Sequence, residues 1–220
     1  MTSHEKQQQV TAAPQPGAPW AEVARWRKAE RSRLLEARRA GSVEAAHVMD
    51  HVLASHIEAF LRSRGPLSEL VLSAYWPFRG EPDLRPLLAA LHGEGATIAL
   101  PDVTEKNGPL TFRRWTPDTR MIRGFWNILV PPRDAEPVTP EVIIDPLVGW
   151  SAPGYRLGYG GGYFDRTLAS LRTRGHRHIA IGIGRHAARL DTIHPQPHDI
   201  ALDVLITEQG IVGGAAPGTA

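Results

Sequence analysis

Cysteine is absent from the 220 residues of this chain. Its absence excludes disulfide bridges, thiolate catalysis and cysteine-ligated zinc sites. The sequence also lacks any apolar run approaching the roughly 20 residues that cross a bilayer, which argues against an integral membrane protein. Residues 1–18 are rich in Gln, Pro and Ala and contain no apolar signal-peptide core. We therefore predict a disordered segment over residues 1–19 and a cytoplasmic protein.

Positive charge is concentrated in one segment rather than spread along the chain. The net charge is only +2, whereas residues 25–39 hold seven basic and two acidic side chains, a local charge of +5. The uniform basicity that is typical of dedicated nucleic-acid-binding proteins is therefore missing. A basic helix is commonly a solvated surface. Alternatively, Arg27 and Arg31 lie four residues apart and could hold one anion together.

Hydrophobic periodicity predicts helices first and then strands that alternate with helices. Apolar residues recur with helical spacing over residues 20–40 and again over 42–62, where Ser42 is suited to cap the second helix. The further predicted helices are 83–92 and 163–172, and the predicted strands are 70–75, 97–100, 110–115, 142–148, 178–183 and 204–207. This order predicts one three-layer α/β/α domain over residues 20–212, with a mostly parallel, open, Rossmann-like sheet. We expect residues 213–220 to form a flexible tail.

The most informative segment is R-L-G-Y-G-G-G-Y-F-D, which runs from Arg156 to Asp165. It lies between an apolar run and a helix-like run, and residues 158–162 include four glycines. Glycines allow backbone N–H groups to turn toward an anion, and the start of the following helix adds unpaired N–H groups. Arg156 adds a permanent charge, and Asp165 could hold the Mg²⁺ that accompanies a nucleotide. We predict a phosphate-binding loop, although the spacing matches neither a Walker A loop nor a dinucleotide fingerprint.

Two further acids are candidates for a metal site. Asp199 and Asp203 lie before and at the start of the last predicted strand, and either could complete a Mg²⁺ shell with Asp165. A carboxylate that caps a loop turn is an equally good interpretation of each. His47 and His51 are one helical turn apart, but no third ligand accompanies them. We therefore treat the histidines as surface or packing residues.

Aromatic side chains follow the first predicted strand, at the edge where ligands bind in open α/β sheets. Trp76 and its neighbours could face a flat heterocycle, and Glu81 could bind the N–H groups of that ring. Core packing for the aromatics and a solvated glutamate are the simpler alternatives. The same two interpretations apply to Trp126, in a segment rich in glycine and proline.

The string from Arg156 to Asp165 resembles the signature of the 5-formyltetrahydrofolate cyclo-ligases, also called methenyltetrahydrofolate synthetases. The similarity extends from about Arg25 to Val212. Further landmarks of this family occur in the expected order, in the first helix, at residues 75–84, and from His198 to Glu208. The chain departs from the family pattern at Arg27, where lysine is usual, and at Ser151, where an acid is common.

The resemblance implies a single α/β domain that closes 5-formyltetrahydrofolate to 5,10-methenyltetrahydrofolate, using ATP and Mg²⁺ and releasing ADP and phosphate. We expect a monomer that binds these small molecules and neither a membrane nor nucleic acid. The rival hypotheses are a related ATP-dependent enzyme that acts on another formamide or amino-pyrimidine, and a non-catalytic relative that binds RNA.

The family pattern also implies roles for individual positions. The implied ATP-binding residues are Arg27, Lys28, Arg31, Arg156, Leu157, Gly158, Tyr159, Gly160, Gly161, Gly162, Tyr163 and Phe164. The implied folate contacts are Trp76, Glu81, Trp126 and the stretch from Tyr159 to Tyr163. Asp165 and Asp199 are the implied Mg²⁺ ligands, and Arg156 and Asp165 are the implied catalytic residues.

Overall fold

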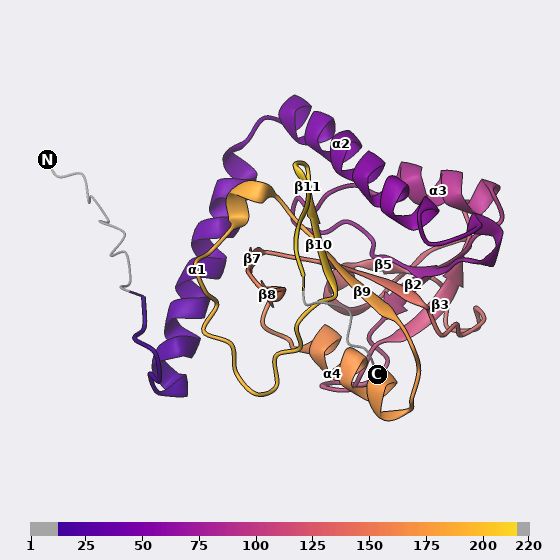
Figure 1. Ribbon diagram of the computed structural model, residues 1–220. Coiled ribbons are helices and arrows are strands. Elements are labelled where there is room, and N and C mark those ends of the chain that lie inside the picture. The colour runs from indigo at the N-terminus through magenta and orange to yellow at the C-terminus, as the bar shows by residue number, and fades with distance from the viewer. Residues whose placement is uncertain (1–12, 215–220) are drawn as a thin grey trace, which may run out of the picture.

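A seven-stranded sheet forms the centre of the computed structural model, which describes residues 13–214 (Figure 1). Its strand order is β11-β10-β9-β6-β1-β2-β3. The five inner strands are parallel, whereas the two edge strands β3 and β11 are antiparallel to their neighbours. This arrangement confirms the predicted fold class. The strands are β1 (Val71–Ser73), β2 (Thr97–Asp102), β3 (Thr111–Trp115), β6 (Val142–Pro146), β9 (Ile179–Ile183), β10 (Val204–Thr207) and β11 (Gly210–Gly213).

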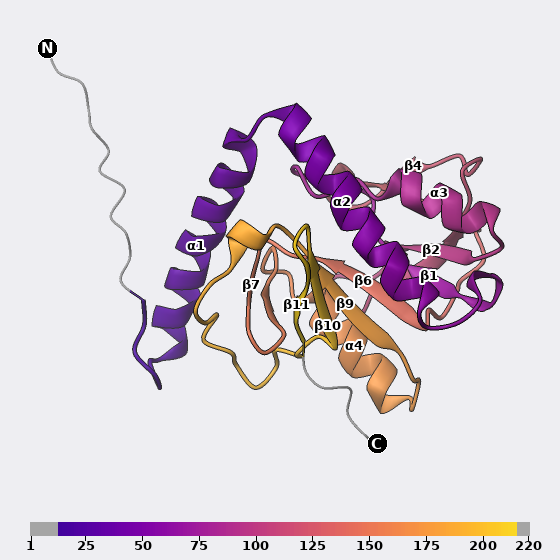
Figure 2. The ribbon, with the colours of Figure 1, turned by 45° about the horizontal axis from the view of Figure 1, so that its top comes forward.

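Helices cover both faces of this sheet (Figures 1 and 2). The helices α2 and α3 lie over one face, α4 lies over the other, and α1 runs along the side of the domain. Each covering helix contributes leucines or isoleucines to one of two hydrophobic clusters, one on each side of the sheet. The α-helices are α1 (Trp20–Ala40), α2 (Val43–Arg62), α3 (Arg85–Gly93) and α4 (Tyr163–Thr173), and short 3₁₀ turns occupy Leu67–Glu69, Phe125–Asn127 and His186–Ala188.

The apolar strands are continuous rather than alternating because both of their faces are buried. In β6, Val142 and Ile144 pack into the cluster beneath α2 and α3, whereas Ile143 packs on the opposite face with α4. Every residue of this strand is buried. A short run of β-branched residues therefore indicates a strand of a parallel sheet that is covered by helices on both faces.

The helix boundaries follow the local sequence signals. Gly41 ends α1, and the hydroxyl of Ser42 accepts a hydrogen bond from the N–H of Ala45 at 3.1 Å, as expected of an N-terminal cap. The predictions of helices over residues 20–40 and 42–62 are confirmed.

Short hairpins are the main elements that the sequence pattern did not predict. The predicted strand over residues 142–148 ends at Pro146, and a hairpin of β7 (Gly149–Ser151) and β8 (Tyr155–Leu157) precedes the glycine loop. Arg156 therefore belongs to a strand rather than to the loop itself. A second hairpin pairs β4 (Ile122–Arg123) with β5 (Leu129–Val130). Strands of two or three residues are too short to show an alternating pattern.

The chain termini lie partly outside the described residues. Within the predicted lead-in, residues 15–18 form a turn closed by a 3.0 Å hydrogen bond from Ala18 N to Gln15 O. At the other end, β11 extends to Gly213, so the segment before the predicted tail is an unpredicted edge strand. Residues 1–12 and 215–220 are outside the described part, and the predicted disorder of the lead-in and flexibility of the tail stay predictions.

The strand order reverses between β1 and β6. From β1 the chain adds β2 and β3 on one side, and it then returns to place β6, β9 and β10 on the other. In open α/β sheets, ligands bind beyond the carboxyl ends of the strands at such a reversal.

Candidate active site

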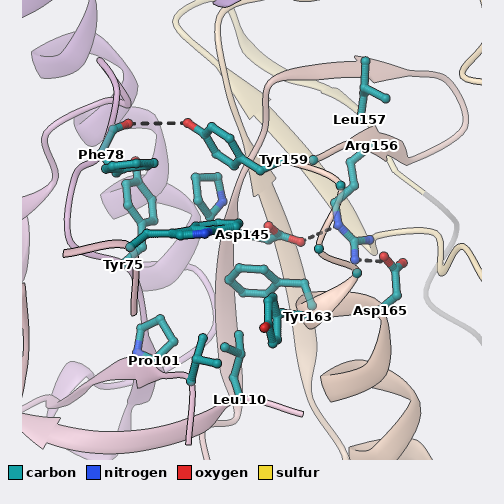
Figure 3. Close-up of a pocket in the computed structure, with 18 of the residues that line it drawn as sticks. Tyr75, Phe78, Pro101, Leu110, Asp145, Arg156, Leu157, Tyr159, Tyr163 and Asp165 are labelled. Carbon is teal, nitrogen blue, oxygen red and sulfur yellow. Dashed lines mark hydrogen bonds and ion pairs between the residues drawn. The ribbon is translucent and has the colours of Figure 1, made fainter. Parts of the chain in front are cut away.

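A cavity of about 350 Å³ opens beyond the carboxyl ends of β1, β2 and β6 (Figure 3). Its walls come from segments far apart in sequence. One wall carries Tyr75 and Phe78, and another carries Tyr159, Tyr163 and the glycine loop. The first turns of α1 also contribute. This volume lies within the range of small-molecule sites.

The glycine loop ends as the cap of α4. Gly160 and Gly162 have φ values of +94° and +65°, which residues with a Cβ rarely adopt. Gly162 occupies the N-cap position and makes no side-chain cap bond. The first N–H groups of a helix have no intrahelical acceptor, so those of Tyr163 and the residues after it are suited to bind an anion.

Helix α1 holds the loop from the other side. The Nε of Arg31 donates a 2.6 Å hydrogen bond to the carbonyl of Gly158. Two turns further on, Nη1 of Arg38 donates to the hydroxyl of Tyr159 at 3.3 Å. One face of the basic helix therefore contributes to the cavity, whereas Arg25, Lys28, Arg33 and Arg39 on its other side are exposed to solvent.

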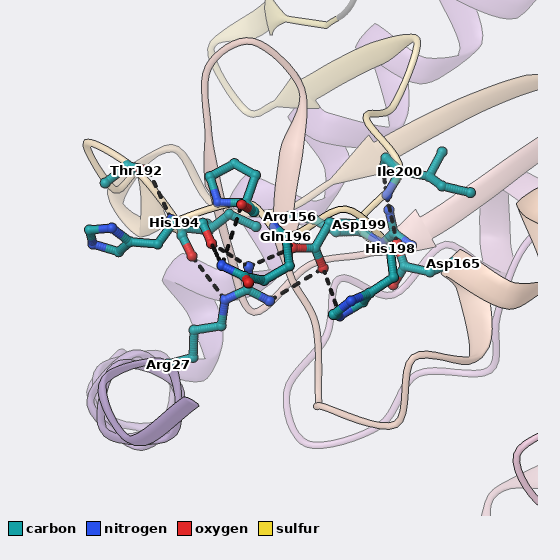
Figure 4. Close-up of polar contacts among 11 residues, drawn as sticks. Arg27, Arg156, Asp165, Thr192, His194, Gln196, His198, Asp199 and Ile200 are labelled. Atoms are coloured by element: carbon teal, nitrogen blue, oxygen red, sulfur yellow. Dashed lines mark hydrogen bonds and ion pairs between the residues drawn. The ribbon is translucent and has the colours of Figure 1, made fainter. Parts of the chain in front are cut away.

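Arg27 is buried, and its guanidinium is bonded within the protein (Figure 4). It donates 2.9 Å hydrogen bonds to the carbonyls of Ile193 and His194 and forms a 2.5 Å ion pair with Asp199. Burial would raise the pKa of Asp199, but Arg27 and the N–H of Gln196 outweigh burial and hold that pKa below its ordinary value. Arg27 and Arg31 both line the cavity, and each also has a partner within the protein. That the two guanidinium groups hold one anion together stays a prediction.

A chain of three charged residues lies at the base of the cavity (Figure 3). Arg156 Nε lies 2.5 Å from a carboxylate oxygen of Asp145, and its Nη2 lies 2.9 Å from Oδ1 of Asp165. Its Nη1 donates to the carbonyl of Ile200 at 2.8 Å. Burial raises the pKa of Asp145 to about 7; Arg156 opposes this rise and Asp165 adds to it.

Two carboxylates along the cavity suit a magnesium ion. Asp165 and Asp199 both line it, whereas Asp203 accepts a 2.7 Å hydrogen bond from the N–H of Ala180 and does not. Among residues 13–214, no three His, Asp or Glu side chains lie close enough together to hold a metal ion by themselves. Mg²⁺ needs no such group, since one or two carboxylates together with phosphate oxygens and water are its usual shell. The two acids therefore fit the ion.

The far end of the cavity combines aromatic faces with a buried acid. Phe78 and Trp126 present nearly parallel rings, at 12° to each other with centroids 6.4 Å apart. Glu81 is 8% exposed and accepts a 2.9 Å hydrogen bond from the N–H of Phe78. Burial raises its pKa to about 7, and the N–H of Phe78, Tyr159 and Arg38 limit the rise. A flat ring with polar edges matches these walls.

A sequence model of the 5-formyltetrahydrofolate cyclo-ligase family matches residues 23–208. The chain belongs to this family. It is 32% identical over 163 residues to 5-formyltetrahydrofolate cyclo-ligase of Mycolicibacterium smegmatis, which covers 68% of this chain and 82% of that protein. It is 28% identical over 141 residues to the Haemophilus influenzae protein of the same name, with 61% and 74% covered.

A solved structure agrees with this assignment. The NMR structure of Aquifex aeolicus 5,10-methenyltetrahydrofolate synthetase matches with a TM-score of 0.70 and 25% identity, over 88% of this chain and 95% of that one. As a member of the cyclo-ligase family, the chain is an enzyme, a ligase. The resemblance seen in the glycine signature is thereby confirmed.

The structure gathers nearly all the predicted site residues of this cyclo-ligase family member around the one cavity. Every residue predicted to bind ATP, folate or metal lines it, with the exception of Lys28. Lys28 is exposed on α1 and lies outside the lining. His47 and His51 line a separate groove between α2 and α3.

Sequence reasoning missed several lining residues. Asp145 is an acidic residue in an otherwise apolar strand, and this departure from the apolar pattern could have marked it as a candidate site residue. Phe78 lies in a loop and Phe125 begins a 3₁₀ turn of three residues, and neither segment shows periodicity, so only the fold reveals that they face Trp126. Trp20 stands half-exposed at the start of α1, where Arg27 lies over its ring at 5.6 Å.

Three of the seven basic residues of α1 are withdrawn from the surface that the RNA-binding hypothesis needs, whereas Arg25, Lys28 and Arg39 stay exposed. Of the basic residues of α1, Arg27, Arg31 and Arg38 turn toward the protein, and Arg33 pairs with Glu30 on the surface at 2.6 Å.

Among residues 13–214, no helix combines the length and apolar character that would be needed to cross a membrane.

Proposed function

We propose that this enzyme cyclises 5-formyltetrahydrofolate to 5,10-methenyltetrahydrofolate, with ATP and Mg²⁺, releasing ADP and phosphate. One observation carries the proposal. A single cavity has a phosphate-suited glycine loop with Asp165 at one end, and an aromatic end with the buried Glu81 at the other. Family membership supports the same reaction.

The glycine loop is proposed to hold the phosphates of ATP. Backbone N–H groups after Gly162 offer donors to the phosphate oxygens, and Arg156 places a permanent charge close by. Arg31 keeps the loop against α1 through the Gly158 carbonyl. The triphosphate would thus be held by groups that are already in place, which avoids reorganisation during transfer.

The aromatic end is proposed to hold the pterin ring of the folate. The near-parallel faces of Phe78 and Trp126 suit a flat heterocycle, and the Glu81 carboxylate can accept hydrogen bonds from ring and amino N–H groups. Tyr159 lies between the two ends and donates a 3.4 Å hydrogen bond to the carbonyl of Phe78. The formyl group would then point toward the loop.

The reaction needs an oxygen that can leave. Attack of the formyl oxygen on the γ-phosphorus breaks the bond to ADP and converts the formamide oxygen into a phosphate ester. N10 of the same folate attacks the activated carbon and loses its proton, and the C–O bond breaks to release phosphate. The attack is intramolecular and closes a five-membered ring, so positioning accounts for much of the rate. The protein's part is to align the formyl oxygen and offset phosphate charge.

Asp165 and Asp199 are the residues proposed to hold Mg²⁺ beside the phosphates. When bound, the ion would neutralise charge that develops on the phosphoryl oxygens. Arg156 holds one oxygen of Asp165, and Arg27 with the Gln196 N–H holds Asp199. Both carboxylates are therefore oriented before any ligand enters.

The decisive experiment mixes purified protein with ATP, Mg²⁺ and 5-formyltetrahydrofolate and follows the methenyl chromophore. Formation of one ADP per methenyl product is expected. The matched control is Asp165→Asn, which keeps the size of the side chain and removes its charge, and a loss of at least a hundredfold in kcat/KM is expected. A folded wild-type protein that forms no chromophore overturns the proposal.

A related enzyme that acts on another formamide or amino-pyrimidine would use the same ATP site. Thermal unfolding with ATP and Mg²⁺ held constant separates the two possibilities. Cyclo-ligase function predicts that 5-formyltetrahydrofolate raises the Tm, and that Trp126→Ala reduces this rise. A larger rise with a different formamide would favour the related activity.

A further inference from the structure

Asp145 is a buried acid for which the proposed reaction provides no direct task. It lies near the carboxyl end of β6, after three apolar residues, and is 2% exposed. A carboxylate at such a depth is unfavourable unless a charged partner compensates for the lost water. Burial of Asp145 in the strand therefore destabilises the folded protein unless a neighbouring group offsets the cost.

Arg156 is the partner that compensates. Its Nε lies 2.5 Å from Asp145 Oδ2, in an ion pair whose geometry departs from an aligned hydrogen bond. The Arg156 side chain is itself only 5% exposed. Of its other nitrogens, Nη1 donates to Ile200 O at 2.8 Å, and Nη2 forms an ion pair with Asp165 at 2.9 Å that is likewise not an aligned hydrogen bond. One guanidinium thus joins two carboxylates from β6 and α4.

This sharing determines how Asp165 is presented. An arginine commonly grips one carboxylate with two parallel N–H groups, and such a grip would occupy both oxygens of Asp165. Here Asp145 takes the Nε edge, so Arg156 meets Asp165 through a single nitrogen at Oδ1. The N–H of Ile200 donates to the same Oδ1 at 3.0 Å. Both contacts fall on one oxygen, which leaves Oδ2 for the cavity.

We propose that Asp145 is a positioning residue that divides Arg156 between two carboxylates, and so keeps one oxygen of Asp165 directed at the metal–nucleotide complex. The inference rests on the proposed ATP and Mg²⁺ site. It assigns Asp145 no contact with the reacting atoms. Without its charge, Arg156 turns fully to Asp165 and neutralises it.

The test compares Asp145→Asn with wild type by calorimetric titration of ADP in the presence and absence of Mg²⁺. The substitution keeps the size of the side chain and removes the charge that attracts Arg156. Binding of Mg²⁺–ADP is expected to weaken at least tenfold, whereas binding of metal-free ADP changes less than threefold. In the cyclisation assay, the Mg²⁺ concentration for half-maximal rate rises, and the KM for 5-formyltetrahydrofolate stays within twofold.

Asp102→Asn is the matched structural control. Asp102 is also buried, at the end of β2, and it forms a 3.6 Å ion pair with Arg113 outside the cavity lining. Its substitution is expected to lower the Tm but to leave the affinity for Mg²⁺–ADP unchanged. A merely structural role for Asp145 would give the same pattern, and that result overturns the proposal.

A double-substitution cycle tests the route through Asp165. If Asp145 acts by way of Asp165, adding Asp145→Asn to the Asp165→Asn variant weakens Mg²⁺–ADP binding by less than a further twofold. Additive losses contradict the proposal, as does a rise confined to the folate KM. If Asp145→Asn does not fold, Asp145→Glu replaces it; the displaced charge is expected to weaken Mg²⁺–ADP binding by an intermediate factor, and unchanged binding overturns the proposal.

Failure of the cyclisation proposal gives a different result from failure of this inference. If wild-type protein binds Mg²⁺–ADP but makes no methenyl product, the assigned reaction is wrong, whereas the calorimetric comparison still decides the role of Asp145. If wild-type protein binds no Mg²⁺–ADP, both are wrong.

Discussion

Arg31 on the first helix donates its Nε–H to the carbonyl of Gly158, 127 residues further along the chain, at 2.6 Å. This contact joins the most basic segment of the sequence to its most glycine-rich segment. A Cβ built on Gly160 would also lie 3.4 Å from the Arg31 guanidinium, so the loop and the helix are closely packed. The pairing makes α1 a part of the proposed nucleotide site.

Arg31→Ala is expected to raise the KM for ATP about tenfold, because the loop loses both its tether and a nearby charge. The effect on folding should be small, since the side chain is only partly buried. Lys28→Ala is the control, as Lys28 lies on the same helix but outside the cavity lining. Equal effects of both substitutions on the KM would indicate a general electrostatic effect of the helix rather than the specific contact.

Gly162→Ala is expected to weaken ATP binding and to lower stability by about 1–2 kcal/mol. The φ of Gly162 is +65°, and an added Cβ would lie 2.8 Å from Nη1 of Arg166. Gly41→Ala is the control, because nothing lies within 4 Å of its Cβ position, its φ is −72° and it lies outside the cavity lining. Kinetics with varied ATP and thermal unfolding of both variants measure the difference. A Gly162→Ala protein with wild-type KM and Tm would contradict the requirement for left-handed backbone here.

The fold could be predicted from the sequence because each layer leaves a periodic signal. Long helices such as α1 and α2 carry apolar residues at helical spacing and clear boundaries, and both matched the prediction. The buried strands were recognisable as short apolar runs. The hairpin before the glycine loop was not, because its three-residue strands contain too few positions for any period to appear.

The residues of the candidate site were predictable only where chemistry and spacing coincide. The repeated glycines indicate a backbone with positive φ angles, which turns N–H groups toward an anion. The protein partners of Arg27 could not be predicted, because a basic residue on a helix gives no sign of the groups that it will meet; they come from residues 193–199. Phe78 could be placed only once the fold had brought its loop against Trp126.

Glu81 is expected to make stability depend on pH. Its folded-state pKa is about 7, against an ordinary value of 4.5, so between these values the folded protein binds more protons than the unfolded chain. Stability from this group is therefore present at pH 4.5 and is lost as pH rises toward 7, by at most roughly 3 kcal/mol. Glu81→Gln removes the dependence and is expected to raise the Tm at pH 8 but not at pH 4.5.

The Glu81→Gln variant is also expected to lose affinity for folate at pH 8, because an amide replaces the carboxylate acceptor. Glu69→Gln, at an exposed glutamate, controls for the loss of one charge. Thermal unfolding from pH 4.5 to 8 and the folate KM at pH 8 supply the data. An equal gain in Tm at both ends of the pH range would mean that burial does not perturb Glu81 in the folded state.

Trp126→Ala is expected to raise the KM for 5-formyltetrahydrofolate at least tenfold and to leave the KM for ATP within twofold. The ring is 49% exposed, so its removal leaves the core intact, but it deprives the pterin of one aromatic face. Val48→Ala removes an exposed apolar side chain from α2, outside the cavity lining, and serves as the control. Steady-state kinetics with each substrate varied in turn provide the measurement. A change confined to ATP would place the nucleotide, not the folate, at this end.

Arg27→Ala is expected to act on stability more than Arg31→Ala does. Arg27 is 4% exposed and holds three groups of the loop before β10, namely the carbonyls of Ile193 and His194 and the carboxylate of Asp199. Its removal takes away the guanidinium donor to the Ile193 carbonyl, leaves Gln196 as the donor to His194 O and to Asp199, and removes the counter-charge of Asp199. Breaking such a buried pair costs about 3–5 kcal/mol. For a domain of this size, thermal unfolding should show a fall in Tm of roughly 6–20 °C. Arg27→Lys keeps the charge but cannot reach all three groups, so an intermediate Tm is expected. An Arg27→Ala protein with wild-type Tm and a raised KM for ATP would instead make Arg27 a nucleotide ligand.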